Sequence, residues 1–329
     1  MTALNEQQHP WFVAHKRFST VGVALCVTIA FWIGLNIVLS GLVSAYFPQG
    51  DLPSWVTLLV SSGPLYLVAM PLGVLALGPV PALNTRRFDL GPKRFLAWLI
   101  MCVPVMYVGN ILGTMLSTLI SGGQSTDRVT EILRNGAPIP TFVFAVILAP
   151  VFEEWLFRKQ LIDRTRRYGE KTAILLSAVA FALFHLNFYQ FFYAFGLGLV
   201  FGYVYMRTSR MRYSVLMHAL INLNGSVVAP WLLSQVDPKL VSGELTEADL
   251  MRLAANPPAG LMLAGCYSLL IIGLLIAGVA LLCVNLKKLE FYTTPEELPK
   301  GTGARTAFGN PGMIVYVVLT LALTVWMML

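Results

Sequence analysis

Long apolar runs separated by short polar segments dominate the hydrophobicity pattern of this 329-residue chain. A helix needs about 20 apolar residues to cross the hydrocarbon of a bilayer, so runs of this length predict membrane spans. The pattern predicts nine such segments, of which the fourth and fifth are short: residues 20–46, 55–79, 95–120, 140–157, 172–186, 188–206, 213–233, 260–284 and 312–329. The predicted fold class is all-α, a polytopic transmembrane helical bundle of about eight or nine spans.

Composition supports a membrane protein. Charged residues make up 12% of the chain and hydrophobic residues 57%, whereas soluble proteins carry about 25% charged residues. Because a soluble chain cannot bury this much apolar surface, a soluble enzyme, a nucleic-acid-binding domain and a disordered protein are excluded. The cysteines lie unpaired inside apolar runs, which fits neither a disulfide framework nor a zinc knuckle: Cys26, Cys102, Cys266 and Cys283.

The basic residues alternate between successive loops. If the N-terminus is cytoplasmic, 19 of the 23 Lys and Arg residues fall in inside loops, as the positive-inside rule requires. The residues on the other side are Arg128, Arg134, Lys239 and Arg252. We therefore predict a cytoplasmic N-terminus. The net charge of +7 then reflects topology, with anionic lipid as the partner of the basic inside loops and no nucleic acid.

Three connecting segments are polar. Residues 122–139 predict a short amphipathic helix or loop on the outside, and residues 236–259 predict an exposed polar loop. Residues 285–311 contain charges and three prolines, which predicts a linker to the last span.

A few ionisable or amide side chains lie within the apolar runs, where each charge costs roughly 2.5–3.5 kcal/mol at a helix centre. Glu153 and Glu154 end the fourth run and His185 ends the fifth, while His218 and Asn222 lie one helical turn apart in the seventh.

The spacing around a predicted turn brings the acids and one imidazole together. Glu153 lies 16 residues before Gly169 and His185 lies 16 residues after it. At 1.5 Å per residue, both lie about 24 Å from the turn on antiparallel helices. Pro150, which lacks a backbone N–H, is a candidate for a kink that opens a water cavity in the fourth helix.

Each of these residues alone has a structural explanation. Glu154 and Arg158 form an i,i+4 pair that predicts a salt bridge, and a lone His or Asn can join two helices. Two acids, two imidazoles and an amide from three helices instead predict a functional site. Adjacent helical residues diverge by about 100°. Of Glu153 and Glu154, one is therefore expected to act as a base and the other to be the buried partner of Arg158.

The residue types point to hydrolysis, most naturally of a peptide bond. A carboxylate with imidazoles can activate water directly as a general base, or with a bound metal that supplies Lewis acidity. An imidazole and an amide can donate to a developing oxyanion. Two alternatives stay open: a non-proteolytic scaffold or immunity protein, and a proton-coupled transporter that uses Glu and His as a relay.

Three motifs in order, Glu153-Glu154-x-x-x-Arg158, Phe181-x-x-x-His185 and His218-x-x-x-Asn222, resemble those of the CPBP intramembrane proteases. This family includes the type II CAAX-processing endopeptidases. The resemblance covers residues 140–230 and implies that Glu153 activates water with help from His185. It also implies that Glu154 and Arg158 support the site, while His218 and Asn222 stabilise the oxyanion.

The resemblance implies further properties of the whole chain. Since the family is described as metalloproteases, Glu153, His185 and His218 become candidate ligands of a divalent metal such as zinc. The expected substrate is a membrane-associated or lipidated protein or peptide, and the expected location is a bacterial cytoplasmic membrane. The regions are then an N-terminal transmembrane region (1–139), a protease core (140–235), and an outside loop with C-terminal spans (236–329).

Overall fold

The computed structural model of the chain describes residues 10–47, 52–127, 131 and 136–328. These residues form helices joined by coil, and no strand occurs among them. Eight of the described helical rods are long and apolar enough to cross a membrane, by length and composition. The predicted all-α polytopic fold is confirmed, and the protein is a multi-pass integral membrane protein.

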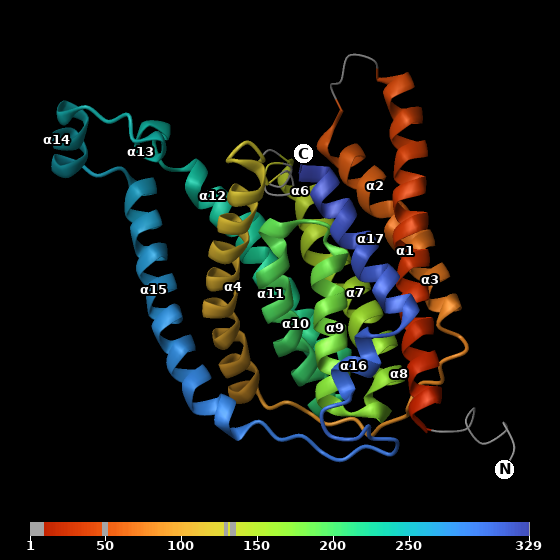
Figure 1. The fold of residues 1–329 in the computed structure, drawn as a ribbon. Coiled ribbons are helices and arrows are strands. Elements are labelled where there is room, and N and C mark those ends of the chain that lie inside the picture. The colour runs from red at the N-terminus through yellow and green to blue at the C-terminus, as the bar shows by residue number, and fades with distance from the viewer. Residues whose placement is uncertain (1–9, 48–51, 128–130, 132–135, 329) are drawn as a thin grey trace, which may run out of the picture.

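The first four rods run in alternating directions through the bundle (Figure 1). The first is α1 (Pro10–Tyr46), the second joins α2 (Ser54–Pro64), η1 (Leu65–Ala69) and α3 (Met70–Ala76), and the third is α4 (Pro92–Ser121). The fourth is continuous through α6 (Pro138–Thr141), η2 (Phe142–Leu148), α7 (Ala149–Glu154), η3 (Trp155–Ile162), α8 (Asp163–Thr165) and η4 (Arg166–Tyr168). Four of the η segments, η1, η2, η3 and the later η5, are π-helical.

The second half of the chain contains α9 (Glu170–Phe184), α10 (Phe188–Thr208) and a rod of α11 (Met211–Leu223), η5 (Asn224–Val228) and α12 (Ala229–Ser234). Two short helices follow, α13 (Pro238–Ser242) and α14 (Glu247–Ala255). The last rods are α15 (Ala259–Asn285), extended by η6 (Leu286–Lys288), and α17 (Pro311–Met328), with the short α16 (Gly303–Phe308) between them.

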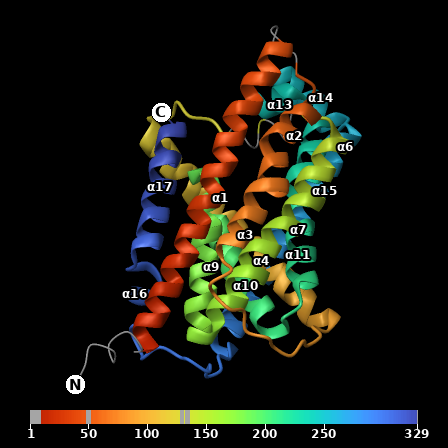
Figure 2. The same ribbon diagram turned by 90° about the vertical axis from the view of Figure 1, so that its right-hand side faces the viewer.

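The fifth predicted span, residues 172–186, corresponds to α9 and is not one of the eight membrane-length rods. Its 15 residues give a helix of about 22 Å, which is shorter than the hydrocarbon core. Most of its side chains are buried by neighbouring helices. Its apolar run therefore reflects burial in protein, and α9 is the central helix of the bundle (Figure 2).

Close helix packing around α9 comes from small residues and one long-range hydrogen bond. Gly198 of α10 lies against Ala178 of α9, as small-residue spacing favours in membrane helices. On the other side of α9, Tyr316 of α17 donates its hydroxyl proton to the Ala180 carbonyl at 2.8 Å. Gly22 of α1 and Gly312 bring α1 and α17 into backbone contact.

Replacing Gly109 of α4 with valine is expected to destabilise the bundle by about 1–3 kcal/mol, because overpacking forces helices apart. A Cβ atom at Gly109 would overlap the backbone of Phe192 and Tyr193 in α10. Thermal unfolding in detergent measures the effect. Gly34→Val is the matched control, since a Cβ at that position in α1 meets nothing within 4 Å. Equal unfolding temperatures for the two variants would contradict the packing argument.

The five predicted inside loops gather at one end of the bundle, the lower end in Figure 1. Arg17 near the start of α1 donates to the Tyr168 hydroxyl, and the Phe88 amide donates to the Thr208 carbonyl. Arg166 reaches both Thr85 and Ser209. The loops that carry most of the basic residues thus lie together at one end of the fold, called here the basic end. The side of the membrane on which this end lies stays a prediction. Of the four opposite residues, Arg128 and Arg134 lie outside the described residues.

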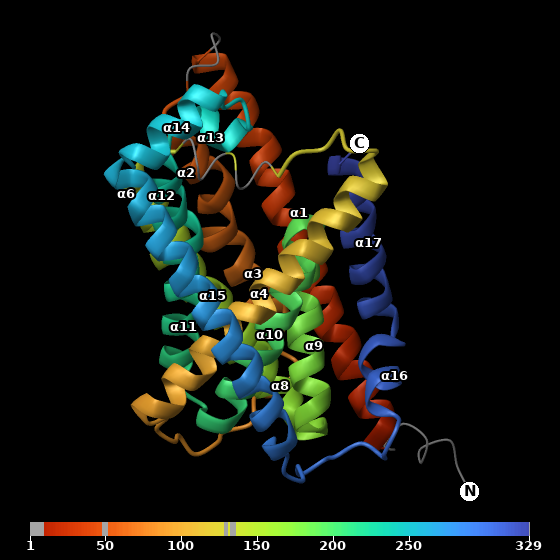
Figure 3. The same ribbon diagram turned by 90° about the vertical axis from the view of Figure 1, so that its left-hand side faces the viewer.

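The connecting segments differ in part from the predicted loops. Within 122–139, the structure describes only 122–127, 131 and 136–139. Segment 236–259, predicted as an exposed loop, contains α13 and α14, which project at the end of α15 away from the bundle (Figures 1 and 3). The predicted linker 285–311 lies along the basic end, where the amides of Glu296 and Leu298 donate to the carbonyls of Arg167 and Tyr168.

Candidate active site

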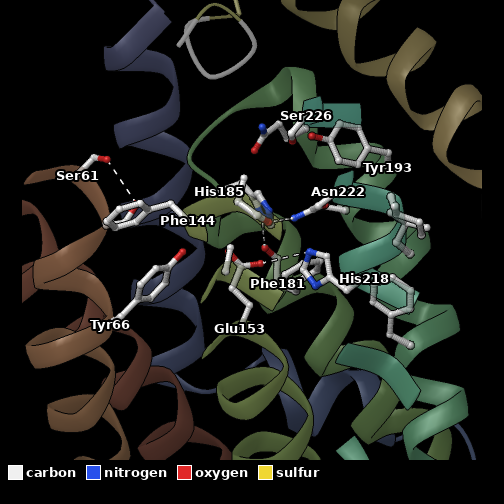
Figure 4. A pocket seen from close by; sticks show the side chains of 18 of the residues that line it. Ser61, Tyr66, Phe144, Glu153, Phe181, His185, Tyr193, His218, Asn222 and Ser226 are labelled. Carbon is white, nitrogen blue, oxygen red and sulfur yellow. Dashed lines mark hydrogen bonds and ion pairs between the residues drawn. The ribbon is translucent and has the colours of Figure 1, made fainter. Parts of the chain in front are cut away.

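A tight turn at the basic end aligns the two helices that carry the first two motifs. Gly169 has φ +129°, a conformation that suits glycine, and its amide donates to the Arg166 carbonyl. The rod carrying the acids and α9 are therefore antiparallel, as the sequence spacing predicts. The third motif enters on α11, and all three motifs meet around one cavity (Figure 4).

Glu154 and Arg158 form a fully buried ion pair, with Nε of Arg158 3.0 Å from Oε2 of Glu154 and both side chains 0% exposed. Arg158 also donates to the Ser177 hydroxyl, which in turn donates to the Phe157 carbonyl. The guanidinium lies over the Phe181 ring, 4.7 Å from its centroid. Since aromatic walls exclude water, this pair is poorly screened, and each charge depends on the other.

His218 connects the ion pair to the cavity. Its Nδ1 lies 3.2 Å from Oε1 of Glu154, and a carboxylate paired with Arg158 can only accept there, so Nδ1 donates. A carboxylate that holds one ring nitrogen fixes the orientation of the other. Nε2 of His218 is then directed towards Glu153, 3.8 Å from Oε2.

Glu153 is the carboxylate that faces the cavity. Its side chain keeps 15% exposure, whereas that of Glu154 is fully buried. The 100° step between adjacent helical residues explains this separation. The two acids thus occupy different surroundings: Glu154 is neutralised by Arg158, and Glu153 lines open space opposite His218.

His185 presents one defined ring nitrogen to the cavity. Its Nδ1 lies 2.7 Å from the Phe181 carbonyl one turn earlier. Because a carbonyl can only accept, Nδ1 carries the proton and Nε2 is left as an acceptor. The ring also packs edge-on against Phe181, 4.7 Å between centroids, which limits its rotation. Such a nitrogen can accept a hydrogen bond from water.

Asn222 lies one turn beyond His218 and also lines the cavity. Its Nδ2 donates to the backbone carbonyl of Ala145 in η2 at 2.8 Å. One of its two amide protons is therefore committed to the rod that carries the acids, and the other is left for the cavity.

The cavity has a volume of about 320 Å³. Besides the motif residues, its walls include residues of the first two rods, which lie outside the resembling segment: Trp32, Leu58, Ser61, Ser62 and Tyr66. Tyr66 stacks on Phe152, 4.8 Å between centroids, and Trp32 donates its indole N–H to the Ser61 carbonyl. Sequence reasoning missed these residues because aromatic and hydroxyl side chains are ordinary in membrane helices.

The three candidate metal ligands, Glu153, His185 and His218, all line the cavity. Among the residues that the structure describes, no group of three or more His, Cys, Asp and Glu side chains is placed to hold a metal ion. His218 already directs Nδ1 to Glu154 and His185 directs Nδ1 to a backbone carbonyl. These bonds leave Nε2 of both rings available, and metal-ligating histidines make the same contacts with their second nitrogen. Metal binding at these residues stays a prediction from the resemblance.

The fold and the site together define a polytopic membrane protein with a carboxylate–imidazole–amide cluster around an internal cavity. Residues 135–224 match the family described as Type II CAAX prenyl endopeptidase Rce1-like. The membrane-embedded CAAX protease MroQ of Staphylococcus aureus (strain USA300) is 30% identical to this chain over 153 residues. The aligned region covers 44% of this chain and 61% of MroQ, so the chain spans less than two thirds of that relative.

No solved structure matches the chain significantly. The two matches confirm the resemblance to CAAX proteases, and the matched segment 135–224 contains all seven residues named in the three motifs. They support a membrane endopeptidase, which is a coarser statement than a substrate or a catalytic subtype.

Proposed function

We propose that the protein is an intramembrane endopeptidase that hydrolyses a peptide bond of a membrane-associated or lipidated protein or peptide. The observation that carries the proposal is that the two adjacent glutamates have different surroundings. Glu154 is held by Arg158 and orients His218, while Glu153 faces a cavity shared with His185 and Asn222. The similarity to a membrane-embedded CAAX protease supports the same class of reaction.

The proposed reaction uses Glu153 as the general base. Glu153 takes a proton from a water molecule that Nε2 of His185 helps to orient, and the water oxygen attacks the carbonyl carbon. The electron pair moves to the carbonyl oxygen, which the free N–H of Asn222 and Nε2 of His218, when protonated, can stabilise. When the C–N bond breaks, Glu153 returns the proton to the leaving nitrogen. The side chains of the chain supply each of these steps, and no step is assigned to a metal.

The test is cleavage of membrane-anchored peptides by the purified protein in liposomes, with products identified by mass spectrometry. We expect cleavage by the unaltered protein and strongly reduced cleavage by Glu153→Gln. A transporter would instead give pH-dependent proton flux without cleavage, and a scaffold would retain its cellular phenotype when Glu153 and His185 are replaced. Either result would overturn the proposal. Cleavage measured after treatment with a chelator, and again after zinc is restored, decides the metal prediction.

A further inference from the structure

Three of the π-helical segments end two residues before a proline: η1 before Pro71, η2 before Pro150 and η5 before Pro230. A proline has no N–H, and its ring clashes with the carbonyl four residues earlier, so the regular helix cannot continue. π-Helical turns inside α-helices accommodate such breaks and are frequent at functional sites.

The same hydrogen-bond shift occurs in all three segments. The residue before the proline donates to the carbonyl five positions back: Met70 to Leu65, Ala149 to Phe144 and Ala229 to Asn224. In this five-back pattern, the carbonyl one residue further along the helix would accept from the residue after the donor. That residue is the proline, which has no N–H. In η2 that carbonyl belongs to Ala145, so Pro150 leaves it without a donor from its own helix.

Asn222 supplies the missing donor: its Nδ2 donates to the Ala145 carbonyl, with 2.8 Å between the two atoms. Asn222 lies on α11, 77 positions further along the chain. In a regular α-helix, the Ala149 amide would occupy that carbonyl. The bond fixes the plane of the Asn222 amide. It also leaves one amide proton uncommitted in the cavity that Ala145, Ala149 and Glu153 line.

We propose that Pro150 and Ala145 are positioning residues for Asn222: the carbonyl that Pro150 leaves without a helical donor anchors the Asn222 amide, so that its second N–H points at the oxygen of the scissile carbonyl. This inference rests on the proposed endopeptidase function. The anchor holds α11 to the rod of Glu153, three residues beyond Pro150. The break in the helix thus couples the base to the oxyanion donor.

A double-mutant cycle tests the anchor. Pro150→Ala supplies a new N–H, so the Ala145 carbonyl gains a helical donor whether the segment stays π-helical or becomes α-helical. We expect kcat to fall about tenfold with KM nearly unchanged, because the lost interaction acts in the transition state. Asn222→Ala should lower kcat about 10²–10³-fold, as removal of an oxyanion donor does. The variant with both changes should be no slower than Asn222→Ala.

Matched variants separate positioning from folding. Pro230→Ala removes a proline with the same backbone pattern but without the Asn222 contact, and it should leave kcat unchanged. Pro150→Ser supplies the same N–H as Pro150→Ala and should reproduce its effect. Thermal unfolding in detergent confirms that each variant is folded. Equal slowing by Pro150→Ala with and without Asn222 would overturn the anchor while the protease function stands.

A readout without catalysis distinguishes the two hypotheses. In protein labelled with ¹⁵N-asparagine, the side-chain amide signals of Asn222 are assigned by their loss in Asn222→Ala. We expect the hydrogen-bonded proton to shift upfield in Pro150→Ala and to stay in place in Pro230→Ala. An unchanged signal in Pro150→Ala would refute the anchor even if no peptide were cleaved. Failure of both the unaltered protein and Glu153→Gln to cleave any substrate would refute only the endopeptidase.

Discussion

Replacing Glu153 with glutamine is expected to lower kcat for peptide cleavage about 10²–10⁴-fold, the range that a general base contributes. The amide keeps the shape of the side chain and its place opposite His218, but it cannot take a proton from water. The loss corresponds to roughly 3–5 kcal/mol of transition-state stabilisation. Initial rates in liposomes, measured over a range of substrate concentrations, give kcat and KM separately.

Two controls make this result specific. Glu296→Gln makes the same chemical change at the basic end, where Glu296 pairs with Arg17 and Arg167, and it should leave kcat unchanged. Glu153→Asp keeps the carboxylate but shortens its reach, so partial activity is expected. If folded Glu153→Gln cleaves at the unaltered rate, Glu153 is not the base.

Replacing Arg158 with alanine is expected to cost about 3–5 kcal/mol of unfolding free energy, because it leaves the Glu154 carboxylate buried without a counter-charge. The Ser177 hydrogen bond and the contact with the Phe181 ring are lost as well. Denaturant or thermal unfolding in detergent measures the change. Replacing both partners, in Arg158→Met with Glu154→Gln, should recover most of the loss, since neither new side chain carries a charge that needs a partner.

The control for Arg158 is Arg212→Ala at the basic end. Arg212 pairs with Asp89, but its side chain is 60% exposed, and exposed ion pairs contribute about 0–1 kcal/mol. A small loss of unfolding free energy for Arg212→Ala and a large loss for Arg158→Ala would show that burial of the ion pair determines the loss. Equal small effects at both positions would contradict the buried-pair argument.

Much of the site could be predicted because charged groups are rare in apolar runs. Glu153, His185 and His218 stand out for this reason. The equal distances of Glu153 and His185 from Gly169 indicate that these two meet, whereas His218, about eight residues from the turn near Arg210, matches their depth less well. The difference between Glu153 and Glu154 follows from helix geometry alone. Their placement around one cavity agrees with these expectations, while their catalytic roles stay proposals.

Other features depend on contacts that no local pattern contains. The bond between Asn222 and Ala145 requires both a proline-freed carbonyl and the approach of a distant helix. Trp32 and Tyr66 line the cavity because tertiary packing stacks them on Phe184 and Phe152. Helix α14, by contrast, could have been predicted from the sequence. Thr246 and Asp249 form a capping box at its start, and their spacing is a known signal of a helix N-terminus.

The position of α17 against α1 and α9 has a consequence for biogenesis. Proteins emerge from the ribosome N-terminal end first, so α9 is inserted long before residues 311–328 are made. Until then, the flank of α9 that later receives Tyr316 stays open to lipid or to an insertion chaperone. The packing around α9, the helix that ends at the His185 turn, is therefore complete only after most of the chain has been made.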